Sequence, residues 1–190
     1  MTEISIRTAV GRIHIIQHNS NIESSLDVGA SYDFTHEIPT RVPQSTSVHR
    51  GVRSYALGSE MASCLVILPG ETPLAHSNAL VRDRILYLAS GFTLCALDER
   101  ELSLLWSLDL PSGFKNGFYF PPLERTVIAL GCTDAVCVNF DGSIRWSINL
   151  PSAPTGHVAI GEDSINIECG CGKRMSADFQ TGTNLGITKA

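Results

Sequence analysis

Two short segments of the sequence repeat each other closely, and they constrain the fold more than any other feature. Trp106–Pro111 reads WSLDLP and Trp146–Pro151 reads WSINLP, so the two copies begin 40 residues apart. The chain contains 2 tryptophans, and each of them opens one copy. A third copy, FTHEIP at 34–39, carries Phe34 in the tryptophan position. A period of about 40 residues is the length of a four-stranded β-propeller blade, so the sequence predicts a repeat architecture.

The residues between these copies have the pattern of β-strands. Short apolar or alternating runs are bounded by Gly, Pro, Asn, Asp or Ser, and no longer stretch has the apolar spacing of a helix. Fitted to the repeat, the 190 residues divide into five units, at approximately 1–39, 40–76, 77–111, 112–151 and 152–190. We therefore predict an all-β chain that forms a single domain, a small β-propeller of about five four-stranded blades with ~38 residues each. The alternative is an open propeller arc that a second chain completes.

The turn before each tryptophan, and a similar turn near residue 180, point to a known repeat. The segments that carry it are Ala96-Leu-Asp98, Asn139-Phe-Asp-Gly142 and Asp178-Phe-Gln-Thr-Gly182. They resemble the repeat of PQQ-type (quinoprotein-like) β-propellers, in which a turn of this kind precedes a Trp that docks onto the next blade. The resemblance covers residues 76–190 and is weaker before them. It implies an architecture and no cofactor, because the ligands of a quinone site have no counterpart in this sequence.

Charge and apolar patterning narrow the choice of partners. The formal net charge is −5 and no run of Lys or Arg occurs, which argues against nucleic acid or a membrane surface as the main partner. The first residues lack the apolar core of a signal peptide, and no apolar run approaches the length of a membrane span. We therefore expect a cytoplasmic protein, and reduced thiols follow from that expectation.

The six cysteines fall into two groups. Cys64, Cys95 and Cys137 lie in apolar strand segments and are predicted to pack in the core. Cys169 and Cys171 are separated by one residue, and the repeat places Cys132 opposite Cys171. These three thiols are weak candidates for a metal or redox site, because the paired spacing of structural zinc is missing. We expect small turn residues there and no metal.

The sequence assigns no catalytic residue. Neither a nucleophile elbow nor a phosphate-binding loop occurs, and the segments predicted to line a central channel carry no Asp or Glu. The turns between second and third strands are instead predicted to form one rim with the connections between blades. The predicted rim residues are Phe92, Phe114, Lys115, Asn116, Asp134, Lys173 and Arg174. Aromatic side chains beside cationic ones are typical interface anchors, unless both phenylalanines fold back onto the sheet.

The function predicted from these features is a non-catalytic binding or scaffold module that captures a protein partner on one rim. A lectin-like module that binds carbohydrate is the first alternative, and a small-substrate hydrolase is the second. Fold analogy alone does not decide among them.

Overall fold

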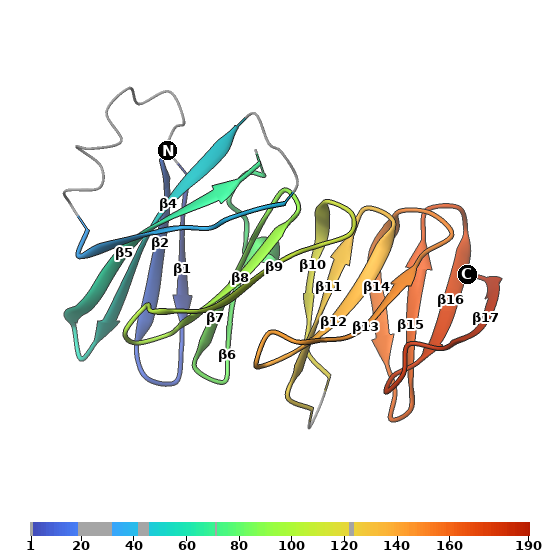
Figure 1. Cartoon of the computed structure of the whole chain (residues 1–190). Helices are drawn as coiled ribbons and strands as arrows, with labels where there is room; N and C mark the ends of the chain where they lie inside the picture. The colour runs from blue at the N-terminus through green and yellow to red at the C-terminus, as the bar shows by residue number, and fades with distance from the viewer. Residues whose placement is uncertain (1, 19–31, 42–45, 71, 122–123) are drawn as a thin grey trace. The chain divides into compact units, whose positions relative to one another are not determined.

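The computed structural model describes residues 2–18, 32–41, 46–70, 72–121 and 124–190. The chain divides into two compact units, Met1–Asp109 and Leu110–Ala190, which are described separately below. Both units are built from β-sheets (Figure 1), and the first also contains a short 3-10 helix, η1 (His76–Asn78). Over the described ranges, no helix has the length and apolar character needed to cross a membrane.

The first unit contains two sheets. One sheet has the order β1-β2-β4-β5-β3, with β1 (Thr2–Arg7), β2 (Arg12–His18), β4 (Ser47–Ala56) and β5 (Ser59–Pro69) antiparallel. Strand β3 (Phe34–Glu37) pairs in parallel with β5 at the edge of this sheet. The other sheet is a meander of β6 (Ala79–Arg82), β7 (Ile85–Ser90), β8 (Thr93–Asp98) and β9 (Leu104–Asp109).

The second unit contains two four-stranded meanders. The first comprises β10 (Phe114–Tyr119), β11 (Thr126–Gly131), β12 (Asp134–Asn139) and β13 (Ile144–Asn149). The second comprises β14 (Pro154–Ile160), β15 (Ser164–Cys169), β16 (Lys173–Asp178) and β17 (Asn184–Lys189). These two sheets and the β6–β9 sheet lie within the ranges 112–151, 152–190 and 77–111 that the repeat delimits.

The blade count differs from the prediction at the start of the chain. The predicted blades 1–39 and 40–76 contribute their strands to one five-stranded sheet, so the structure has four sheets rather than five. In the range 40–76, a single ten-residue strand, β4, runs through Gly51, and 73–76 forms no strand. Gly51 lies in mid-strand because its backbone pairs with β2 and β5, and a Cβ there would overlap the Tyr32 hydroxyl. A glycine inside a strand often marks such a close approach rather than a turn.

Each unit has its own apolar core. In the first unit, alternate residues of β2, β4 and β5 pack against β7 and β8, and both Cys64 and Cys95 are fully buried there. In the second unit the core lies between the β10–β13 and β14–β17 sheets and includes Cys137, which is also 0% exposed. The predicted core positions of these three cysteines are confirmed.

The repeated aromatic residue joins neighbouring sheets within the second unit. Trp146 on β13 is 5% exposed, and its Nε1 donates a hydrogen bond of 2.7 Å to the carbonyl oxygen of Phe179. Its ring lies against Gly182, where a Cβ would come within 2.7 Å of the Trp146 Cβ. The prediction that this tryptophan docks onto the next sheet is confirmed. In the first unit, His36 on β3 makes a similar contact through Nε2, 2.9 Å from the carbonyl oxygen of Leu102.

Candidate binding site

The predicted rim exists as an edge at which side chains cap the turns. In the three meanders, at the turn between the second and third strands, a backbone N–H donates to a hydroxyl from the connection that precedes the sheet. The pairs are Gly91 to Thr72 (2.8 Å), Thr133 to Ser112 (3.1 Å) and Cys171 to Ser152 (3.1 Å). We call this the capped edge of each sheet. The connections and these turns therefore share one edge, as predicted.

The structure places the predicted rim residues in different environments. Phe114 is 6% exposed and its ring packs 4.8 Å from that of Phe118, so the prediction of an exposed anchor at Phe114 is wrong. The aromatic ring folds into the sheet because burial stabilises it. Asp134 is also buried, at 2% exposed, and desolvation raises the pKa of its carboxyl group. Its buried side chain is therefore not accessible to a partner at the rim.

The remaining rim residues are at least partly accessible. Asn116 donates a hydrogen bond of 2.6 Å to the carbonyl oxygen of Pro154, which links β10 to β14. Arg174 is exposed and pairs with Glu168 at 2.7 Å. Phe92 is half-buried, and Lys115 and Lys173 are exposed. A binding role for these side chains stays a prediction.

The cysteines near the capped edge are free thiols. Cys132 is half-buried, Cys169 is buried and Cys171 is exposed. Burial raises the pKa of Cys169, whereas a hydrogen bond from Ser152 lowers the pKa of Cys171, with a smaller effect from Lys173. Among the described residues, no group of three or more His, Cys, Asp or Glu side chains is arranged to hold a metal ion.

The opposite edge of the first unit carries a feature that the sequence analysis missed. The turn after β8 begins at Asp98, whose backbone N–H bonds to the Ser103 carbonyl oxygen, just as Asp178 bonds to Thr183 after β16. The next residue is Phe179 after β16 but Glu99 after β8, and its backbone N–H makes equivalent bonds in both turns. Glu99 is 3% exposed, and its Oε1 has no hydrogen-bond partner. A comparison of 98–99 with 139–140 and 178–179 could have found this change from Phe to Glu.

Glu99 lines a cavity of about 320 Å³ between the two sheets of the first unit. The apolar lining comes from the β1–β2 turn, the β4–β5 turn and the strands beside them, and the polar lining includes three arginines. The lining residues are Val10, Arg12, Ile13, Ser54, Tyr55, Ala56, Leu57, Met61, Arg84, Glu99 and Arg100. We call this the Glu99 cavity. Its volume is at the lower end of the range for small-molecule and anchor-residue pockets.

Exposed apolar side chains surround the mouth of the Glu99 cavity. Leu57 is fully exposed (106%) at the tip of the β4–β5 turn, and its φ of 51° lies in the left-handed region. Val10 is 48% exposed and Met61 is 45% exposed. Leucine in a left-handed conformation is unfavourable, so this turn holds an apolar side chain in water at an energetic cost.

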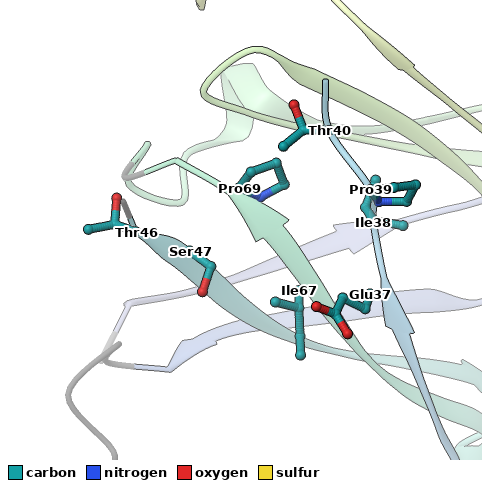
Figure 2. A pocket seen from close by; sticks show the side chains of 8 residues that line it. All are labelled: Glu37, Ile38, Pro39, Thr40, Thr46, Ser47, Ile67 and Pro69. Atoms are coloured by element: carbon teal, nitrogen blue, oxygen red, sulfur yellow. The ribbon is translucent and has the colours of Figure 1, made fainter. Parts of the chain in front are cut away.

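A second cavity, of about 530 Å³, lies at the end of β3. Figure 2 shows its lining side chains, which come from β3, the residues after it, and the paired ends of β4 and β5. The lining residues are Glu37, Ile38, Pro39, Thr40, Thr46, Ser47, Ile67 and Pro69. None of these residues has a buried side-chain polar atom without a partner. The Glu99 cavity is therefore the better candidate for a specific site.

The fold resembles solved structures at low sequence identity. BamB from Moraxella catarrhalis aligns over 100% of this chain and 52% of its own, with a TM-score of 0.53 and 13% identity. The computationally designed Ika8 protein aligns over 77% of this chain and 47% of its own (TM-score 0.55, 16% identity). A europium-containing methanol dehydrogenase aligns over 60% and 24% (TM-score 0.50, 13% identity). The fold is that of a small β-propeller.

The predicted resemblance to PQQ-type repeats is confirmed at the level of the fold, since BamB and the methanol dehydrogenase are propellers of this type. This propeller chain spans about half the length of BamB. No family model matches it, and no curated protein matches it. Identities this low show the fold alone and carry no function with them.

Proposed function

We propose that this propeller is a non-catalytic binding module that captures a protein partner, and that the partner contacts the edge around the Glu99 cavity. The observation that supports the proposal is the group of exposed apolar side chains there: Val10, Leu57 and Met61. Single exposed apolar residues are ordinary on a protein surface, but a group around a cavity is typical of an interaction site. The proposal moves the binding edge away from the capped edge, where Phe114 and Asp134 are buried.

The test is cross-linking capture from the native cell with the full chain and a Leu57→Asp, Met61→Asp variant. We expect the wild type to cross-link to a discrete partner and the variant to lose that partner. Both side chains are exposed, so the variant should keep its stability.

A matched control is Leu185→Asp, because Leu185 is also an exposed leucine, at 60%, but lies on β17 in the other unit. The control should capture the same partner as the wild type. Capture of the same partner in equal amount by wild type and double variant would contradict the proposal.

A further inference from the structure

The Glu99 cavity has a polar floor where the other turns of this type carry an aromatic ring. Phe179 is 1% exposed and part of the core of its unit, and Phe140 occupies the equivalent position after β12. In the first unit the Glu99 side chain takes this place, with a cavity beside it and with Oε1 unpartnered. A buried acceptor without a donor is costly, and a group that binds there and supplies a donor would remove that cost. The floor of the cavity is therefore suited to an N–H or O–H donor.

The mouth of the cavity carries positively charged side chains. Arg12, Arg84 and Arg100 line it and are exposed. Of the ion pairs between described residues, none includes these three arginines. Arg12 lies over the Tyr55 ring, 5.1 Å from its centroid, which orients one of the three guanidinium groups at the cavity. The chain as a whole has a net charge of −5, so this concentration of cationic groups is a local feature.

We propose that the Glu99 cavity recognises an acidic segment of the partner protein that carries an apolar anchor residue. The anchor side chain packs against Leu57, Met61 and Val10. A backbone N–H or hydroxyl group of the segment donates to Glu99 Oε1, and flanking carboxylates pair with the three arginines. Paired carboxylate and guanidinium groups at a partly desolvated mouth give specificity and fast association. This inference rests on the proposed function and adds the chemistry of the partner.

The test uses a labelled probe peptide in which Leu-Ser-Leu is flanked on each side by glutamates, with fluorescence anisotropy as the measurement. We expect the peptide to bind the full chain and to bind more weakly as salt is added. An Arg84→Glu, Arg100→Glu variant should raise the Kd by at least about tenfold, because both charges that face the probe are reversed. A peptide with lysines in place of the glutamates should not bind.

A second variant fills the cavity and leaves the three arginines at its mouth unchanged. Glu99→Phe restores the residue type of the other turns and fills the cavity, so the Tm should be unchanged or higher while peptide binding is lost. Arg41→Glu is the matched control, since Arg41 is exposed after β3 and does not line the cavity. It should bind the probe as the wild type does.

Two results would overturn the inference: equal or tighter binding of the lysine peptide, or wild-type binding of the acidic peptide by Glu99→Phe. Failure of the acidic peptide to bind the wild type would also reject it. The proposed function would stand in each case if the Leu57→Asp, Met61→Asp variant still lost its cross-linked partner. Equal capture by that variant and the wild type would reject the proposed function instead.

Discussion

Glu99 and Phe179 occupy the same place in two copies of one turn, yet they have different consequences. The Phe179 ring closes the space between its sheets, and its carbonyl oxygen accepts the bond from Trp146. The Glu99 side chain leaves a cavity and an acceptor without a donor. The two turns therefore share the same backbone hydrogen bonds and differ in the side chain that follows the aspartate.

Replacement of Trp146 by Phe tests the inter-sheet contact at the level of one hydrogen bond. Trp146→Phe removes the Nε1 donor and leaves the Phe179 carbonyl oxygen without it in a buried site. We expect a loss of about 1–3 kcal/mol in the free energy of unfolding, measured by urea denaturation. The control is Ile144→Ala on the same strand, where a side chain that is 51% exposed should contribute little. Equal effects of the two substitutions would contradict the role assigned to the tryptophan.

Cys171 and Cys169 are neighbours with opposite shifts in pKa. The Ser152 hydrogen bond, and after it the Lys173 charge, lower the pKa of Cys171, so its thiolate is present at lower pH than in an ordinary cysteine. Desolvation has the reverse effect on Cys169. We expect iodoacetamide to modify Cys171 well before Cys169 at neutral pH, as followed by peptide mass spectrometry.

The pH profile of this alkylation identifies the cause of the shift. Ser152→Ala should move the midpoint for Cys171 to higher pH and slow its modification at neutral pH, while Cys169 stays protected. An unchanged midpoint in Ser152→Ala would show that the hydroxyl does not stabilise the thiolate.

At the scale of elements, the turn before each outer strand is the most regular part of the repeat. Gly142 and Gly182 adopt positive φ values of 88° and 71°, and Leu102 adopts 56° at the corresponding position after β8. Glycine adopts this conformation without strain, whereas for leucine the conformation is unfavourable in free energy. Leu102 is nevertheless 0% exposed and belongs to the core of its unit. Burial of the side chain here outweighs the unfavourable backbone conformation.

Two substitutions of Leu102 separate the free-energy cost of its left-handed backbone conformation from the stabilisation that its buried side chain provides. Leu102→Ala keeps the strained backbone and removes most of the buried side chain, at a cost of about 2–5 kcal/mol in the free energy of unfolding. Leu102→Gly removes the same side chain but relieves the strain, which is worth roughly 1–2 kcal/mol. We therefore expect the glycine variant to be more stable than the alanine variant, although less stable than the wild type. Chemical denaturation of the three proteins measures both differences, and an alanine variant that is the more stable would contradict the argument.

The sequence could predict these elements where the period is regular. The copies that begin at Trp106 and Trp146, with their turns, correctly indicated the three meanders and the docking of Trp146. The division of residues 1–76 into two blades is wrong, because β2 pairs with β4 and β3 pairs with β5 across the predicted boundary at residue 39. Within β4, the strand continues through Gly51 because its backbone pairs with β2 and β5, and the Tyr32 side chain occupies the space that a Cβ would fill.

The candidate site was harder to predict than the fold. Exposure of an aromatic residue cannot be read from its place beside a turn, so Phe114 was assigned to the rim although it is buried. The Glu99 cavity lies where one copy of the turn has Glu99 in place of the phenylalanine found in the other two copies. That signal becomes visible only when the copies are compared residue by residue, and the cavity volume becomes visible only in three dimensions.

At the scale of the whole molecule, the two apolar cores are separate. The core of the second unit consists of residues from 119–179, and every strand of its two sheets pairs with another strand of the same unit. Its sheets are also joined by the Trp146 bond and by the hydroxyl of Tyr119, which donates to the carbonyl oxygen of Gly156. All strand pairing of this unit, and the core between its two sheets, therefore lie within residues 110–190.

We therefore expect a fragment of residues 110–190 to fold when it is expressed alone. Its circular dichroism spectrum should show β-structure, and thermal unfolding should be a single cooperative transition, because the core between its two sheets lies within the fragment. Trp146→Phe should lower the Tm of the fragment as it lowers that of the full chain, since the bond lies inside this unit. A fragment that gives a disordered spectrum would show that the second unit needs residues 1–109 to fold, and that the chain behaves as one domain in spite of its two cores.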